Sequence, residues 1–226
     1  MLEILHQLAP HLELLGEELW QCTLQTIQMV VVAGSVSFLL GIIFGVILIV
    51  TRPQGILEKA WLYTLLDKAI NIIRSIPFLI LLVLLIPLSR MIVGTAIGVK
   101  GTYIPLIIGT TPFFARQIET AISQVDPGYI EASIALGFSP LDIIFKVYLR
   151  ESIPSITRGT MITLINLIGL TAMAGVTGGG GLGDFAIRYG YQLNYTDMIV
   201  CSIVIILIMV SIIQIIGNLI IKKTTH

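Results

Sequence analysis

The chain has 226 residues, of which 56% are hydrophobic and 12% charged, and its mean hydropathy is +0.98. A soluble globular domain carries about 25% charged residues, so this composition indicates a membrane protein. The formal net charge is 0, which gives no sign of nucleic-acid binding. The two cysteines stand alone, without a Cys-x-x-Cys or Cys/His cluster, so neither a disulfide framework nor a structural zinc site is indicated.

The first 19 residues contain four glutamates and no lysine or arginine. A cleaved signal peptide begins instead with basic residues and a short apolar core. The leucines of this stretch recur at helical spacing: Leu5, Leu8, Leu12 and Leu15. We therefore expect a short amphipathic helix over residues 1–19 that lies at the membrane surface.

Five longer stretches are apolar enough to cross a membrane, which requires about 20 mostly apolar residues. The predicted spans cover residues 24–50, 70–88, 102–122, 156–176 and 198–221. The third is the least regular, because Gly109, Thr110, Thr111 and Pro112 interrupt it. The sequence therefore predicts an all-α membrane protein with five transmembrane helices in a single domain over residues 1–226.

Lysine and arginine gather on one side of these spans, with nine residues on one side and three on the other. The larger group is Arg52, Lys59, Lys68, Arg116, Lys146, Arg150, Arg158, Lys222 and Lys223. The smaller group is Arg90, Lys100 and Arg188. Cytoplasmic loops are enriched in these residues. The amino terminus is therefore predicted outside, and the carboxy terminus and the segment 123–155 in the cytoplasm.

The segment 123–155 is a polar stretch between two long apolar stretches. Asp126-Pro127-Gly128 is a turn signal. Residues 129–136 can form a short helix, and Gly137 suits the position after it, where φ is often positive. The sequence predicts a helix that ends at a glycine.

A second short helix is predicted from Pro140 to about Glu151. Ser139 is a favourable N-cap residue, Pro140 suits the first helical position, and Asp142 lies at the third. Pro154 is expected to stop or bend this helix. Two short helices around a glycine would form a compact protrusion. Its position would allow a soluble partner to bind it and exert force on it.

This segment resembles the EAA loop of ABC-importer permeases, in which Glu-Ala-Ala, a glycine and a distal Ile-x-Leu-Pro recur. The matching residues are Glu131, Ala132, Gly137, Val147 and Leu149. Ser133 replaces the third residue of the triplet. Arg150 stands where the family usually has proline, so Pro154 is expected to end the second helix instead.

The resemblance covers most of the chain from the first span onward and is to the permeases of methionine importers. The similar blocks are Thr51-Arg52-Pro53, Arg74-Ser75-Ile76-Pro77-Phe78, Ile92-Val93-Gly94-Thr95, Ala115-Arg116, Gly181-Leu182-Gly183 and Tyr189-Gly190-Tyr191. It implies a type I ABC-importer permease fold in the bacterial inner membrane and a homodimer of two identical chains. It also implies two ATPase subunits that grip the EAA loops and a substrate-binding protein on the external face. Assignment to methionine depends on the combination of blocks, because the Arg-Ser-Ile-Pro-Phe block occurs in several amino-acid permeases.

ATP hydrolysis is expected in a partner, because the chain contains no G-x-x-x-x-G-K-[ST] phosphate loop. We therefore expect no catalytic residue, metal or cofactor in this chain, with ATP and Mg²⁺ bound by the ATPase. The predicted ATPase-coupling residues are Tyr129, Ile130, Glu131, Ala132, Ser133, Ile134, Leu136 and Gly137. Ile130, Ile134 and Leu136 are expected to enter a cleft of the ATPase, while Glu131 forms charge-assisted bonds at its edge.

The fourth span is the candidate for the lining of the transport pathway. Five of its residues recur at three- and four-residue spacing and are predicted to share one face: Gly159, Thr163, Asn166, Leu170 and Met173. Asn166 is expected either to bond a neighbouring helix or to line a polar cavity. Met173 either packs as an ordinary core residue or, as the resemblance implies, narrows a gate, for which a flexible thioether is well suited.

Three smaller features complete the predictions. Gly41 and Gly45 form a GxxxG pattern that permits close helix approach, and Arg116 and Glu119 are expected to form a local ion pair. Residues 178–183 match G-x-G-x-x-G, but a dinucleotide site needs a preceding strand. These glycines are expected to form a tight, mobile external loop. Its polar and aromatic residues, which would contact a binding protein, are Asp184, Arg188, Tyr189 and Tyr191.

Three alternatives remain at the level of sequence. The chain could be a permease for another amino acid, or a passive channel or membrane scaffold without an ATPase. A channel has no need of a compact helix–glycine–helix protrusion. An intramembrane enzyme is disfavoured, because the sequence has neither a His-Glu-x-x-His helix nor paired membrane aspartates.

Overall fold

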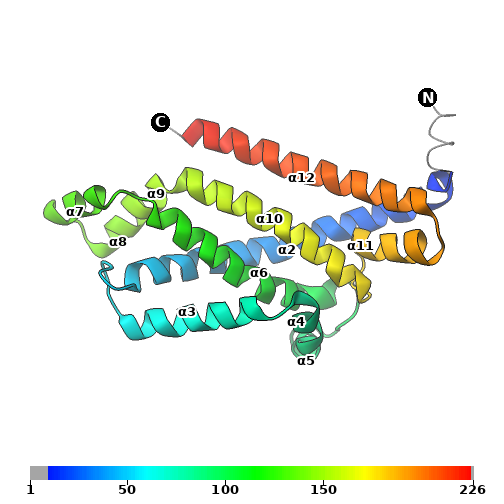
Figure 1. The fold of residues 1–226 in the computed structure, drawn as a ribbon, viewed down its shortest axis with the longest axis horizontal. Coiled ribbons are helices and arrows are strands. Elements are labelled where there is room, and N and C mark those ends of the chain that lie inside the picture. The colour runs from blue at the N-terminus through cyan, green and yellow to red at the C-terminus, as the bar shows by residue number, and fades with distance from the viewer. Residues whose placement is uncertain (1–9, 225–226) are drawn as a thin grey trace. The chain divides into compact units, whose positions relative to one another are not determined.

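The computed structural model describes residues 10–224, and within that range the secondary structure is helical, without a strand. The chain divides into two compact units. Unit 1 comprises Met1–Ser35, Pro77–Ile107 and Leu164–Ile213, and unit 2 comprises Val36–Ile76, Ile108–Thr163 and Gln214–His226. Each of four long helices contributes residues to both units: α2 (Leu12–Thr51), α6 (Gly98–Ser123), α10 (Ile153–Val176) and α12 (Thr196–Thr224) (Figure 1).

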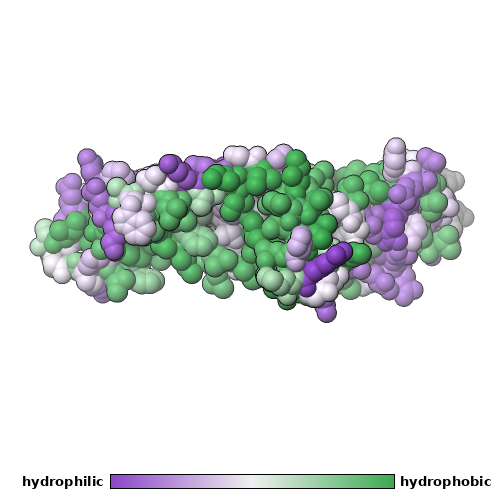
Figure 2. Space-filling model, turned by 90° about the horizontal axis from the view of Figure 1, so that it is seen from below, coloured by the Kyte–Doolittle hydropathy of each residue, from purple (hydrophilic) through white to green (hydrophobic). Residues whose placement is uncertain are grey.

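Within residues 10–224, three helices are long and apolar enough to cross a membrane: α2, α10 and α12. A fourth span results if α5 (Ile86–Val93) and α6 are taken together, although they are bent by 116°. In α12 the most apolar 18-residue window has a hydropathy of 3.1 and is only 6% buried, as expected of a helix that contacts lipid. Hydrophobic side chains cover wide areas of the surface in Figure 2. The number of five spans and their orientation stay predictions.

The predicted surface helix at the amino terminus is wrong for the residues that the structure describes. Leu12 and Leu15 belong to α2, which continues without interruption to Thr51. No proline follows Pro10 until Pro53, so nothing ends the helix between the two parts. Leu15 is buried in the core of unit 1. Leu5 and Leu8 lie outside the described residues.

The predicted second span, 70–88, is not one helix. The chain instead forms α3 (Ala60–Ser75), α4 (Phe78–Leu84) and α5. Pro77 accounts for the first break, because a residue before proline avoids the helical conformation, and Ile76 is extended at φ −84° and ψ 124°. A second proline lies at the start of α5, where the missing N–H is tolerated.

Each unit has its own apolar core. In unit 1, buried residues of α2, α6 and α10 pack together, among them Met29, Leu106 and Leu167. In unit 2, α2 and α6 approach closely, because a Cβ at Gly41 would collide with Phe114 and one at Gly45 with Ile118. The predicted close packing at the GxxxG pattern is therefore confirmed.

Candidate functional site

The first arm of the predicted protrusion is helix α7 (Pro127–Ala135). Asp126 caps it, because its carboxylate accepts a hydrogen bond from the amide of Gly128 at 2.8 Å. The Ser133 hydroxyl donates to the carbonyl of Tyr129 at 2.7 Å. After α7 the chain turns at Gly137, whose φ is +78°, a conformation that favours glycine. The predicted helix and its terminating glycine are confirmed.

The second arm consists of α8 (Pro140–Asp142), the π-helix η1 (Ile143–Tyr148) and α9 (Leu149–Glu151). Ser139 and Asp142 form the predicted capping box. The helical stretch to Glu151 is confirmed, although its middle is π-helical. Pro154 does not end it, since it is the second residue of α10 and only Ser152 separates α9 from α10. Proline is tolerated there because the first amides of a helix lack partners.

The two arms together, residues 127–151, form what we call the coupling hairpin. Three predicted coupling residues project from it, with exposed fractions of 59% for Tyr129, 56% for Ile134 and 75% for Leu136. Glu131, Ala132 and Gly137 are also exposed. Ser133 is buried and supports α7 from within. Ile130 is only partly buried and packs against the core of unit 2, so it does not project outward as Ile134 does.

The sequence reasoning missed two residues of the same surface. Leu141 and Phe145 on the second arm are each 65% exposed. They lie four residues apart in the chain, and the buried residues of this arm, such as Ile144 and Val147, occupy its other side. Two large apolar residues at helical spacing within a polar segment were the available signal. The exposed apolar surface therefore spans both arms.

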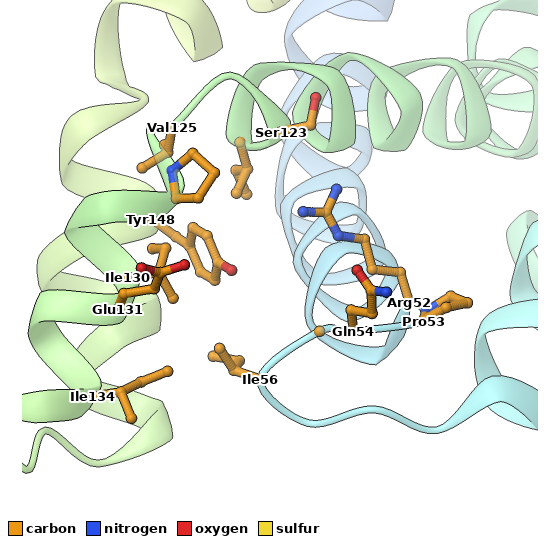
Figure 3. Close-up of a pocket in the computed structure, with 13 residues that line it drawn as sticks. Arg52, Pro53, Gln54, Ile56, Ser123, Val125, Ile130, Glu131, Ile134 and Tyr148 are labelled. Atoms are coloured by element: carbon orange, nitrogen blue, oxygen red, sulfur yellow. The ribbon is translucent and has the colours of Figure 1, made fainter.

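A cavity of about 640 Å³ lies between α7 and the segment that follows α2. Figure 3 shows Ile130 and Glu131 of α7 with Tyr148 of η1 on one wall, and Arg52 and Gln54 on the other. Tyr148 is only 5% exposed, and burial raises the pKa of its hydroxyl against the opposing effect of the nearby Arg52 charge.

Three polar side chains of this cavity are available to a partner. Within the part of the chain that the structure describes, the Arg52, Glu131 and Tyr148 side chains form no hydrogen bond or ion pair. Groups of this kind usually gain partners when they are buried. The cavity therefore continues the exposed surface of α7 toward the segment that follows α2.

Only part of the predicted pathway face is exposed. Within unit 1, Asn166 and Met173 on α10 are exposed, and Met173 exposes 38% of its surface. Within unit 2, Gly159 and Thr163 are buried, and the Thr163 hydroxyl donates to the carbonyl of Gly159 at 2.8 Å.

The exposed side of α10 in unit 1 also includes Gly169 and Val176. At 100° per residue, the centre of this side is rotated by roughly 60° from the predicted face. Thr163 and Leu170 therefore lie toward its buried edge. Asn166 and Met173 of the predicted face are therefore exposed, whereas Gly159 and Thr163 are buried. The role of this face in lining the pathway stays a prediction.

The glycine-rich segment of unit 1 continues into α11 (Gly181–Phe185) and the π-helix η2 (Ala186–Gln192). Residues 178–192 are called the glycine-rich hairpin below. Backbone packs closely here, because a Cβ at Gly175 would collide with the backbone at Gly183 and Asp184, and one at Gly183 with the carbonyl of Ala172. The predicted tightness of this segment is confirmed, whereas its mobility and its external position stay predictions.

Three of the four predicted binding-protein contacts are engaged within the chain. Arg188 binds Asp184 at 2.7 Å and Glu18 at 3.0 Å, and the Tyr189 hydroxyl donates to Glu18 at 2.7 Å. The acceptor Glu18 raises the pKa of Tyr189. Tyr191 is the exposed member of the set, at 74%.

Arg116 forms the predicted ion pair with Glu119, at 2.6 Å. It also binds two residues of α3 that the sequence did not single out. Its guanidinium pairs with the Asp67 carboxylate and donates to the Asn71 side-chain oxygen at 3.0 Å. The ion pair is therefore a connection between two helices of unit 2.

Comparisons with known proteins show which family the chain resembles. Residues 37–223 match the family described as "Binding-protein-dependent transport system inner membrane component". The probable D-methionine transport system permease protein MetI of Vibrio cholerae is 44% identical over 204 residues, which cover 90% of this chain and 91% of that protein. The methionine import system permease protein MetP of Bacillus subtilis is 42% identical over 203 residues, again 90% and 91% of the two chains.

Among solved structures, the chain is similar to one of the inward-facing conformations of the MetNI methionine ABC transporter. The TM-score is 0.89 at 41% identity, with 96% of this chain and 99% of the other covered. An amino acid ABC transporter with histidines shares the fold, at a TM-score of 0.73 and 20% identity, with 91% of this chain and 93% of the other covered. The chain belongs to the family of binding-protein-dependent transport system inner membrane components.

Proposed function

We propose that the chain is the membrane-spanning subunit of an ATP-driven importer that carries methionine into the bacterial cytoplasm. The observation that most supports this proposal is the coupling hairpin, which exposes Tyr129, Ile134 and Leu136 on a segment between two membrane helices. Relatives that match nine-tenths of the chain are named methionine permeases, which supports methionine as the substrate.

In this proposal the permease is a homodimer, with one ATPase subunit docked on the coupling hairpin of each chain. The similarity to the MetNI transporter supports this assembly. ATP and Mg²⁺ belong to the ATPase, and a binding protein delivers the substrate on the external face. The buried part of an interface is enriched in large apolar and aromatic residues, which matches the exposed side chains of both arms.

The hairpin has the construction needed to receive force. Its outer apolar residues, such as Ile134 and Leu136, are exposed. Ile143, Ile144 and Val147 bury the second arm in the same core as Ile118 and Ile122 of α6. An ATPase that closes on ATP would therefore move α7, η1 and α6 together. Rigid-body motion of this kind alternates access to the two sides of a membrane.

The exposed side of α10 is the proposed lining of the pathway. Asn166 supplies an amide and Met173 a flexible thioether. In a homodimer the two copies of this side would face one another across the axis. Met173 is then suited to form a removable apolar barrier, whereas the buried Thr163 supports the helix.

The direct test is transport by the purified complex in lipid vesicles, with ATP inside and the binding protein outside. Methionine should accumulate only with ATP present, and other amino acids should not compete. Glu131→Ala and Gly137→Pro should each reduce uptake, because the first removes a charged contact and the second replaces the glycine at the turn. Glu151→Ala, at an exposed glutamate of the second arm, is the matched control.

Two outcomes would contradict the proposal. Methionine that crosses freely without the ATPase would indicate a channel. Unchanged transport and ATPase association in both hairpin variants would mean that force does not enter through α7. Accumulation of a different amino acid would keep the mechanism and correct the substrate.

A further inference from the structure

Arg116 lies on α6 shortly before its end, and it is held by side chains from two helices. Glu119 of the same helix accepts from it at 2.6 Å, Asn71 of α3 accepts at 3.0 Å, and Asp67 of α3 completes the set. The side chains of Arg116, Glu119 and Asp67 are only 19%, 17% and 29% exposed. We call these four residues the α3–α6 clasp.

An apolar contact lies directly beside the clasp. Ile70 of α3 is buried with Ala115 of α6 and Leu48 of α2. Apolar packing alone leaves helices some freedom to slide. The planar guanidinium adds several donors in one fixed fork, which restricts the angle and register at which its partners can lie. The clasp therefore fixes α3 on α6 at one register.

Stability is a weak reason for this arrangement. A largely buried ion pair contributes little more than apolar residues of similar size, and often less. Arginine and acidic side chains within membrane-spanning segments are costly and usually serve a function, and Arg116 and Glu119 lie within the predicted span 102–122. The placement of these charges on two helices points to a positional role.

The clasp is connected to the coupling hairpin by a short, well-held path. α6 ends at Ser123 and α7 begins at Pro127. Gln124, between them, accepts a hydrogen bond from Ser155 at 2.9 Å. Ile118 and Ile122 anchor the end of α6 in the same core as η1. A displacement of α7 is therefore passed to the part of α6 that carries Arg116.

We propose that Arg116 is a positioning residue that makes α3 follow α6 when the ATPase moves the coupling hairpin. This rests on the proposed function. Without the clasp, α7 and α6 still move but α3 lags, so the subunit consumes ATP without completing the transport step. The predicted signature is uncoupling rather than loss of assembly or of ATP hydrolysis.

The test uses the full complex in lipid vesicles and measures methionine uptake and ATP hydrolysis on the same preparation. Arg116→Gln should lower uptake per ATP by about tenfold, as expected when coupling between sites is weakened, while hydrolysis stays close to wild type. Asp67→Asn, which leaves the pair with Glu119, should give a smaller loss of the same kind. Arg74→Ala removes an exposed arginine from the same helix α3 and should leave the ratio unchanged.

Charge exchange separates a positional role from a merely structural one. Asp67→Arg combined with Arg116→Asp places the guanidinium on α3, where it faces the exchanged carboxylate on α6 together with Glu119, and should recover most of the lost coupling. Each single reversal should be strongly uncoupled. If Arg116→Gln fails to assemble, Asp67→Asn and the exchanged pair still decide the question.

The results have distinct meanings for the two proposals. Unchanged uptake per ATP in Arg116→Gln, or an assembled exchanged pair that is as uncoupled as the single variants, would overturn the clasp. Absence of ATP-dependent uptake by the wild-type complex would overturn the proposed function instead. If the wild type imports a different amino acid, the same ratios are measured with that substrate.

Discussion

The coupling hairpin and the glycine-rich hairpin are built from similar parts and differ in what they expose. Each has a short α-helix and a π-helix next to a long helix. The coupling hairpin keeps large apolar side chains such as Leu136 and Phe145 in contact with solvent. The glycine-rich hairpin buries Leu182 and Phe185 and pairs its charged residues within the chain.

The difference follows from glycine placement. In the coupling hairpin, Gly137 makes a turn at φ +78°, and a Cβ there would meet no atom within 4 Å, so the turn itself is not closely packed. In the glycine-rich hairpin and the helix before it, glycines at 175, 183 and 190 allow backbone or side chains to come too close for any Cβ. In the proposed function the first hairpin binds a separate protein, whereas the second packs against its own unit.

The largest effect should come from the core of the glycine-rich hairpin. Phe185 is 0% exposed and lies in a cluster with Leu19 and Met198. Phe185→Ala should cost about 3–5 kcal/mol of stability through the cavity that it leaves. Thermal unfolding of the purified chain measures this. Tyr191→Ala, at a 74% exposed residue of the same hairpin, should change stability by less than about 0.5 kcal/mol. Equal losses of stability in the two variants would show that burial of Phe185 does not stabilise this hairpin.

The opposite pattern is expected for the coupling hairpin. Leu136→Ala should leave the unfolding temperature unchanged, because the side chain is 75% exposed. It should weaken association with the ATPase by about 2 kcal/mol, as for a central interface residue. Binding of the ATPase to the immobilised permease measures this. Leu193→Ala, at a 51% exposed leucine that follows η2 in unit 1, is the control, and a comparable loss there would show that the association is not specific to the coupling hairpin.

Backbone strain at Gly137 gives a smaller effect. Its φ is +78°, and a Cβ at this position would meet no other atom within 4 Å. Gly137→Ala should therefore destabilise the hairpin only through left-handed backbone strain, by about 1–2 kcal/mol. Gly16→Ala is the matched variant, since Gly16 lies inside helix α2 and also has open space. It should be neutral or stabilising by up to about 1 kcal/mol. Hydrogen exchange of residues 127–142 reports the first change, and thermal unfolding the second.

The ionic network of the glycine-rich hairpin should contribute still less. Glu18 and Arg188 expose 38% and 42% of their side chains, so water screens their attraction. A double-mutant cycle with Glu18→Gln and Arg188→Gln should give a coupling free energy below about 1 kcal/mol. A much larger value would mean that the pair is shielded in the assembled transporter.

The smallest effect concerns pH. Lys146 and Ser139 lower the pKa of Asp142 to about 2, from an ordinary value of 3.8. A lowered pKa means that the stabilisation is fully present above pH 3.8 and is lost as the pH falls toward 2. The unfolding temperature of the wild type should therefore fall more steeply below about pH 4 than that of Asp142→Asn. Parallel curves would show that the capping box does not depend on the charge.

Local signals were sufficient for the coupling hairpin. Asp126, Gly137, Ser139 and Asp142 act on their near neighbours in the chain, through caps and a positive φ. Such interactions do not depend on distant parts of the chain, so the sequence predicts both arms. The effects of the prolines were predicted less well. Pro77 breaks a helix, whereas Pro154 lies at the start of one. Whether a proline ends or begins a helix depends on the conformation of the neighbouring turn.

The sequence by itself determined the membrane character, the helical periodicity, the two arms of the coupling hairpin and the membership of a transport family. These depend on composition, on interactions between near neighbours and on similarity. Only the tertiary structure decided which side of α10 is exposed, that Ile130 faces inward, and that Arg116 reaches Asp67 and Asn71. Those features require segments distant in sequence to meet, because burial and pairing are properties of the packed chain.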